Sequence, residues 1–205
     1  MSIRGVIFDM DGVLIDAKDW HFRALNRGLE LFGEKITYEE HLSRFDGLPT
    51  KVKLKMLSDE GRLDPVSFRF IEAVKQEWTL REAATLCFPN IEHLVLLGNL
   101  SASGLKLGVA TNSIRKTTVT MLTYAGVFDF FDVILTNEDV KNSKPHPEIY
   151  EKACQELGLS AEECLVVEDT ELGSSAAFAA GCQVMRVSNP SDLIASRFSE
   201  LIKSD

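Results

Sequence analysis

The sequence predicts an α/β fold in which helices cover both faces of a parallel β-sheet and a helical insertion follows the first strand. Short apolar runs rich in β-formers alternate with segments of helical periodicity, and the runs are fully apolar in their middle. Such strands are buried on both faces, as in a parallel sheet between two layers of helices. The expected strands are Ile3–Phe8, Leu105–Ala110, Asp132–Leu135, Cys164–Val167 and Cys182–Val187.

The segments between these runs carry start and stop signals for helices. Ser113 is placed to cap the start of one helix, and Gly126 is placed to end it. A second helix is expected to open at Pro147 and to close at Gly158. In sheets of this class, ligands bind beyond the carboxyl ends of the strands, so those ends are where functional residues are sought.

The long segment between the first and second strands has a different texture. It shows helical patterns and no convincing strand, including a helix opened by Asp64 and running through Trp78. A helical insertion directly after a strand end that carries acidic residues favours a lid, and the alternative is a structural elaboration of the first crossover. We therefore expect residues 1–15 and 88–205 to form a catalytic core and residues 16–87 to form a helical cap domain.

Composition restricts the class of protein. The chain has 205 residues, 45% of them hydrophobic and 26% charged, which is enough to bury a sizeable core. The net charge of −9 argues against nucleic acid or an anionic membrane as a partner, and no stretch approaches the ~20 apolar residues that span a bilayer. The first residues lack a secretory pattern, and the four scattered cysteines are typical of reduced thiols. We therefore expect a cytoplasmic protein that is a monomer or a weak dimer.

Two carboxylates follow the first expected strand. Asp9 ends the apolar run, and Asp11 follows with one residue between them. Like charges at the end of a buried strand repel one another and resist desolvation. On its own, the pair is more typical of a solvated turn, with Asp11 and Gly12 as turn residues.

The ends of the other strands change that interpretation. Thr111 and Asn112 follow the second strand at the start of an expected helix, whose free N–H groups favour an anion. Lys144 follows the third strand, and Glu168 and Asp169 follow the fourth. Each feature alone is more typical of an ordinary helix cap, a solvated lysine or an acidic turn. Together they predict carboxylates, a hydroxyl group and an ammonium group at one edge of one sheet.

This combination is consistent with a metal and a phosphate. Crowded carboxylates are stable when a divalent cation lies among them, and oxygen ligands select a hard ion such as Mg²⁺. The ion, Lys144 and the helix N-terminus after Thr111 would supply the positive charge that this acidic chain otherwise lacks. Phosphoryl transfer needs in-line positioning and charge neutralisation, and an aspartate can act as its nucleophile while a neighbour carries the proton.

The same residues resemble the motifs of a known superfamily. The resemblance covers nearly the whole chain, and the helical insertion after the first strand looks like that superfamily's first cap type. In order, the segments resembling the four motifs of the haloacid dehalogenase superfamily are Asp9-Met10-Asp11-Gly12-Val13, Thr111-Asn112-Ser113, Lys144-Pro145 and Glu168-Asp169.

The resemblance implies a Rossmann-like core in which Asp9 is the nucleophile and Asp11 is the general acid/base. It also implies that Thr111, Asn112 and Lys144 bind the transferring phosphoryl group. The second aspartate argues against dehalogenation, because the dehalogenating branch needs no proton donor at that position. The ligands that the resemblance implies for Mg²⁺ are Asp9, the backbone of Asp11, Asp169 and Glu168.

Two segments are similar to the cap of β-phosphoglucomutase-like members of the superfamily. They are DAKDWHFRALN at residues 16–26 and FDGLPTKVK at residues 45–53. The first contains His21, for which a gating role and a partly exposed helix position are both open. The second carries Gly47 at the turn of the loop that would set substrate specificity. Lys75 is a further cap residue that we expect to face the site.

The chain departs from the mutase pattern in two places. Ala17 stands where the mutase has a threonine, and Pro49, Thr50 and Lys51 stand where it has an arginine that grips a second phosphate. Lys51 can substitute as a point charge, but without the bidentate fork. We therefore expect a Mg²⁺-dependent phosphatase of small phosphorylated metabolites, with sugar phosphates as substrates, acting through an aspartyl-phosphate. The alternatives are a β-phosphoglucomutase-type isomerase and a non-catalytic phosphate-ligand sensor.

Overall fold

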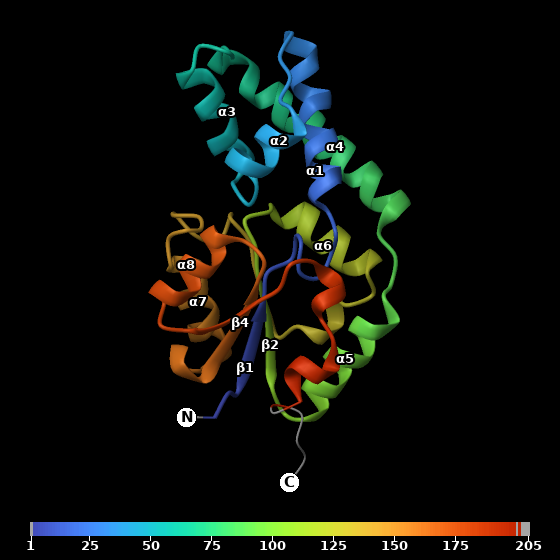
Figure 1. Ribbon diagram of the computed structural model, residues 1–205, viewed down its shortest axis with the longest axis vertical. Coiled ribbons are helices and arrows are strands. Elements are labelled where there is room, and N and C mark those ends of the chain that lie inside the picture. Colours follow the sequence, from blue (N-terminus) through green and yellow to red (C-terminus); the bar gives the residue numbers. More distant parts are fainter. Residues whose placement is uncertain (1, 200, 202–205) are drawn as a thin grey trace. The chain divides into compact units, whose positions relative to one another are not determined.

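The computed structural model describes residues 2–199 and 201, which divide into two compact units (Figure 1). The core unit is Met1–Asp16 with Cys87–Asp205, and the helical unit is Ala17–Leu86. The helical unit is therefore an insertion between the first and second strands of the core unit. Within the described part of the chain, no helix combines the length and the hydropathy that a bilayer span requires.

The core unit is built on a five-stranded parallel sheet, which confirms the predicted α/β class. The strand order is β3-β2-β1-β4-β5, so the first strand of the chain is the central one. All of β1 is buried between β2 and β4, as its apolar run predicts. The strands are β1 Gly5–Phe8, β2 Lys106–Ala110, β3 Val133–Leu135, β4 Cys164–Glu168 and β5 Gln183–Arg186.

Helices cover both faces of this sheet, with α7 and α8 on one side and α5 and α6 on the other (Figure 1). α5 was not predicted from the sequence, although Asn90 is a recognisable cap: its side chain accepts hydrogen bonds from the N–H groups of Glu92 and His93. The helices of the core unit are α5 Ile91–Ala102, α6 Arg115–Tyr124, α7 Glu148–Leu157 and α8 Glu171–Ala179.

The predicted helix ends are correct for α7 and wrong for the start of α6. Pro147 precedes α7, and Gly158 ends it in the left-handed region, at a φ of 67°. Ile114, rather than Ser113, precedes the first residue of α6. The hydroxyl of Ser113 bonds to Asp11 instead, and a local sequence signal cannot reveal that a distant carboxylate competes for it.

A buried apolar cluster of this unit fixes α7 against the sheet. Ile149 and Leu157, on one face of α7, belong to the same buried cluster as Ile7 of β1 and Val166 of β4. Burial of a leucine or isoleucine side chain contributes about 1.5–3 kcal/mol. This packing sets the position of Tyr150, which is adjacent to Ile149 and fully buried.

The helical unit has its own core and contains no strand over residues 17–86, all of which the structure describes. α1 packs along α4, and Gly28 permits the close approach, because a Cβ there would lie 2.9 Å from Cγ2 of Ile71 and 3.0 Å from its carbonyl oxygen. Buried Leu25, Leu29 and Phe45 belong to this core. The elements are α1 Lys18–Leu29, α2 Tyr38–Glu40, a π-helical segment His41–Phe45, α3 Thr50–Asp59 and α4 Phe68–Leu86.

Two boundaries in the helical unit differ from the sequence-based expectation. α4 follows a short 3₁₀ turn that Asp64 caps, and it continues to Leu86, well beyond Trp78. Lys51 lies in the first turn of α3 rather than in the preceding loop. α4 extends past Trp78, where no glycine marks a stop. α3 begins at Thr50, where no side-chain cap marks a start.

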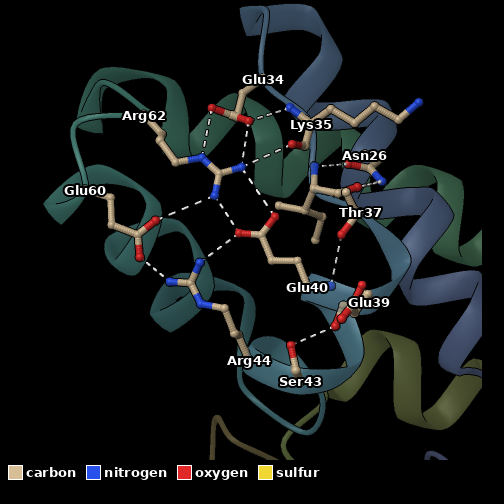
Figure 2. Close-up of polar contacts among 11 residues, drawn as sticks. Asn26, Glu34, Lys35, Thr37, Glu39, Glu40, Ser43, Arg44, Glu60 and Arg62 are labelled. Atoms are coloured by element: carbon tan, nitrogen blue, oxygen red, sulfur yellow. Dashed lines mark hydrogen bonds and ion pairs between the residues drawn. The ribbon is translucent and has the colours of Figure 1, made fainter.

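A network of charged side chains joins helix ends within the helical unit (Figure 2). Arg62 donates to Glu34 from two nitrogens, at 2.9 and 3.2 Å, and to Glu40 at 2.5 Å. Arg44 donates to Glu40 at 2.8 Å and also bonds to Glu60. Single ion pairs at partly exposed positions contribute little to stability, so the network acts through its connectivity: it joins the loops after α1 and α3 to α2 and the π-helical segment.

His41 is a buried histidine at the start of the π-helical segment. It is 1% exposed and lies against Phe22 and Tyr38, with ring centroids 5.4 and 6.3 Å apart. Burial, and after it the charge of Lys53, lowers the pKa of His41 to about 4, with Asp46 opposing the shift. The folded helical unit therefore holds this imidazole neutral at pH values where an exposed histidine carries a proton.

Acidification is expected to destabilise the helical unit between pH 6.5 and about 4. Over this range the unfolded chain binds a proton at His41 and the folded chain does not, so the free energy of unfolding falls as the pH falls. The contribution is fully present above the unfolded pKa, and roughly 3 kcal/mol is lost on descending to the folded one. Both tryptophans, Trp20 and Trp78, lie in the helical unit, so urea unfolding followed by tryptophan fluorescence measures it directly.

The slope of unfolding free energy against pH identifies the group responsible. His41→Phe should flatten the slope, whatever its effect on absolute stability. An unaltered slope in His41→Phe would assign the acid sensitivity to other groups.

Candidate active site

The site is assembled at the carboxyl ends of the central strand, β1, and of its neighbour β4. β1 and β4 pair in register, with Phe8 opposite Val167, and the N–H of Asp9 donates to the carbonyl of Val167 at 2.9 Å. The residues that follow, Asp9 on one strand and Glu168 and Asp169 on the other, are therefore brought together by the sheet. All three are buried.

Lys144 lies between two of these carboxylates. Its Nζ donates to Oδ1 of Asp9 at 2.7 Å and to Oε1 of Glu168 at 2.6 Å, and the residue is 4% exposed. Asn112 holds the backbone of this lysine, since its Oδ1 accepts from the Lys144 N–H at 3.2 Å and its Nδ2 donates to the Lys144 carbonyl at 3.5 Å. The Asn112 side chain therefore connects the loop after β2 to the loop that carries the lysine.

Glu168 is the most heavily hydrogen-bonded residue of the site. Oε1 accepts from Lys144 and from the hydroxyl of Tyr150, at 2.8 Å in the latter case. Oε2 accepts from the N–H groups of Asp169 and Thr170 and from the Thr170 hydroxyl, at 3.0 to 3.1 Å. The carboxylate lies directly against the first turn of α8, where Gly173 has no side chain to displace it.

The second aspartate is oriented from the loop after β2. Oδ2 of Asp11 accepts a hydrogen bond from the Ser113 hydroxyl at 2.7 Å. Thr111 is 1% exposed, and its Oγ1 accepts from the Ser113 N–H at 3.0 Å. Ser113 therefore links Asp11 to Thr111, a role that the sequence analysis missed, because nothing in its local sequence distinguishes it from a helix cap.

Charges in this cluster are strongly coupled. Burial raises the pKa of Asp9 well above its ordinary value, Lys144 opposes this, and the carboxylates of Glu168 and Asp169 add to the rise. Burial lowers the pKa of Lys144, but Asp9 and Glu168 together raise it above its ordinary value. The lysine is therefore held as an ammonium, and the acidic groups outnumber the cation that neutralises them.

That excess of buried negative charge fits a metal ion. Asp9, Glu168 and Asp169 each offer a carboxylate oxygen, and these oxygens lie within 4.8 Å of one another. A donor set made only of oxygens suits a hard cation. The carboxylate of Asp11 is outside this group.

The remaining predicted residues, His21, Gly47, Lys51 and Lys75, belong to the helical unit. His21 Nδ1 lies 3.3 Å from Nζ of Lys75, which joins α1 to α4. Gly47 turns the chain before α3 at a φ of 73°, in the left-handed region that favours glycine. Lys51 is exposed.

Comparison with known proteins defines the class to which this fold and site belong. Residues 6–187 match the haloacid dehalogenase-like hydrolase family, and the chain belongs to that family. It is 31% identical to a phosphorylated carbohydrates phosphatase of Thermotoga maritima over 88% of this chain and 83% of that protein. It is also 30% identical to a phosphoglycolate phosphatase of Salmonella paratyphi A, over 88% and 79% of the two chains.

Solved structures agree on the fold. A β-phosphoglucomutase from Clostridium difficile superposes with a TM-score of 0.84 over 98% of this chain and 97% of that one, at 21% identity. At this identity the likeness establishes the fold alone.

Proposed function

We propose that this hydrolase is a Mg²⁺-dependent phosphatase of small phosphorylated metabolites, with sugar phosphates as its substrates, and that it acts through an aspartyl-phosphate on Asp9. The observation that carries the proposal is the placement of a buried carboxylate 2.7 Å from a buried lysine, at an edge of the sheet where two further acidic residues also lie. Binding of a phosphate alone would need cations and N–H donors, not a buried carboxylate facing the anion. That favours an enzyme over a sensor.

In the proposed reaction, an oxygen of the Asp9 carboxylate attacks phosphorus and the bond from phosphorus to the alcohol oxygen breaks. Asp11 gives its proton to that leaving oxygen and later takes one from the water that hydrolyses the aspartyl-phosphate. Ser113 fixes the orientation of Asp11 for both transfers. Lys144 and Thr111 bind the transferring group, and Asn112 holds the lysine's backbone in place.

Asp9, the backbone carbonyl of Asp11 and Asp169 are the proposed ligands of Mg²⁺, with Glu168 beside them. When bound, the ion supplies positive charge to the phosphoryl oxygens and offsets the repulsion among the carboxylates. Both oxygens of Glu168 already accept protein hydrogen bonds, so this residue contributes mainly by holding Lys144.

We further propose that the helical unit acts as a cap that governs substrate choice, with His21, Gly47, Lys51 and Lys75 among the residues involved. Lys51 is an exposed point charge in the first turn of α3, where a mutase would carry an arginine for a second phosphate. Ala17 offers no hydroxyl. Both features favour hydrolysis over a mutase cycle, in which a bisphosphate intermediate must be held firmly, and two relatives above are named as phosphatases.

Phosphate release tests the proposal. The purified protein should liberate inorganic phosphate from p-nitrophenyl phosphate and from a panel of hexose and pentose phosphates in the presence of Mg²⁺. Excess EDTA should abolish turnover, and added Mg²⁺ should restore it. Full activity in excess chelator would remove the metal from the proposal.

A ³¹P NMR experiment separates the alternatives. β-Glucose 1-phosphate with a trace of the 1,6-bisphosphate should yield inorganic phosphate and little glucose 6-phosphate. Rapid formation of glucose 6-phosphate without free phosphate would establish the isomerase instead. Tight binding of phosphate with no turnover of any ester would establish the sensor.

A further inference from the structure

Tyr150 is a buried side chain of α7 that contacts both charged partners of the site. It is 0% exposed, its hydroxyl donates to Oε1 of Glu168 at 2.8 Å, and Nζ of Lys144 lies 4.8 Å from the centroid of its ring. The same Oε1 accepts the ammonium of Lys144 at 2.6 Å. One carboxylate oxygen is therefore shared between a neutral phenol and a cation.

The two carboxylate oxygens of Glu168 are held in different ways. Oε2 is fixed by backbone N–H groups and the Thr170 hydroxyl at the start of α8. Oε1 accepts from the ammonium of Lys144 and from the hydroxyl of Tyr150. The hydrogen bond from the phenol thus weakens the attraction that Oε1 would otherwise exert on the lysine alone.

We propose that Tyr150 is a positioning residue for the phosphoryl-transfer reaction: its hydroxyl and its ring together set where the ammonium of Lys144 stands between Glu168 and Asp9. The inference rests on the proposed function. Without the hydroxyl, Oε1 of Glu168 draws the ammonium toward itself and away from Asp9 and the group being transferred. The ring attracts the ammonium through its negative face and excludes water beneath it.

Glu168 and Tyr150 are both held by their neighbours. Glu168 packs directly against Gly173, where a Cβ would lie 1.7 Å from Oε1, and its Oε2 is bonded to the start of α8, so the carboxylate is confined on that side. α7 itself is fixed by Ile149 and Leu157, which pack in the core of the unit. Of Glu168, Tyr150 and Lys144, the lysine is therefore the one whose side chain can move, and Tyr150 limits that movement.

Tyr150→Phe tests the hydroxyl. The variant keeps the ring and leaves Oε1 paired with Lys144, so it should fold. We expect kcat/KM for p-nitrophenyl phosphate to fall about tenfold, as for the loss of one hydrogen bond to a charged group. The dissociation constant of orthovanadate, which mimics the transferring phosphoryl group, should rise by a similar factor in isothermal titration. Tyr150→Leu, which also removes the ring, should extend both changes together.

Thr118→Val is the matched control. It also removes a buried hydroxyl from the core unit, one that donates to the carbonyl of Ile114, at 3.0 Å, rather than to a residue of the site. If Tyr150 had only a structural role, the Tyr150→Phe and Thr118→Val variants would lose stability alike while keeping wild-type kcat/KM and vanadate affinity. That result would overturn the inference. A wild-type protein that turns over no phosphate ester would instead count against the proposed function, and the vanadate titration would still decide whether Tyr150 acts on anion binding.

Discussion

Replacing Asp9 with asparagine is expected to reduce kcat by about 10⁴-fold or more, because the amide cannot attack phosphorus to form an acyl phosphate. The fold should survive. The Oδ1 of asparagine can still accept the hydrogen bond that Lys144 donates to Asp9 at 2.7 Å, and one of the mutually repelling carboxylates is removed. Steady-state kinetics with p-nitrophenyl phosphate and a thermal melt measure the two effects on the same sample.

Asp129→Asn is the matched control, since Asp129 is an exposed aspartate of the core unit outside the site. It should leave kcat and the melting temperature unchanged. If Asp9→Asn retained more than a small fraction of wild-type kcat, Asp9 would not be the nucleophile, and direct attack by water would become the better account.

Gly173→Ala is expected to impair both activity and stability, although alanine is the better helix former. The new Cβ would lie 1.7 Å from Oε1 and 2.0 Å from Cδ of Glu168, so the carboxylate that holds Lys144 must move. Misplacement of a positioning group by about 1 Å can cost about 100-fold in rate. Overpacking of this kind also costs about 1–3 kcal/mol in unfolding free energy.

Helix propensity alone gives the opposite sign for stability, because alanine in a helix is favoured over glycine by about 1 kcal/mol. Gly98→Ala in α5 supplies the control: its Cβ would meet only Cε1 of Phe130, at 3.8 Å. That variant should be as active as the wild type and slightly more stable. A Gly173→Ala protein that behaves like Gly98→Ala would show that Glu168 is not confined as the structure indicates.

The sequence predicts those parts of the molecule that depend on local patterns. The central strands are buried on both faces and therefore read as unbroken apolar runs, and acidic residues placed directly after Phe8 and Val167 reach the same edge of the sheet once β1 pairs with β4. Lys144, which follows the third strand and precedes a proline, was identifiable only in combination with the acidic residues at the other strand ends.

The roles of Tyr150, Gly173 and Ser113 depend on contacts between residues far apart in the chain. Nothing near Tyr150 indicates that its hydroxyl bonds to a carboxylate 18 positions later, nor that Gly173 leaves room for that carboxylate. Ser113 has the sequence context of a helix cap, yet its hydroxyl bonds to Asp11, 102 positions earlier. Such roles follow from the packing of β-strands and helices, which a one-dimensional pattern does not record.

The most direct test of the account is capture of the covalent intermediate. Wild-type protein is mixed with substrate and Mg²⁺, quenched in acid within the first turnovers, digested and analysed by mass spectrometry. The account predicts a phosphoryl group on the peptide that contains Asp9, absent from Asp9→Asn protein treated in the same way. Substrate turnover at the wild-type rate with the Asp9 peptide unmodified throughout, or with the phosphoryl group on a different residue, would contradict it.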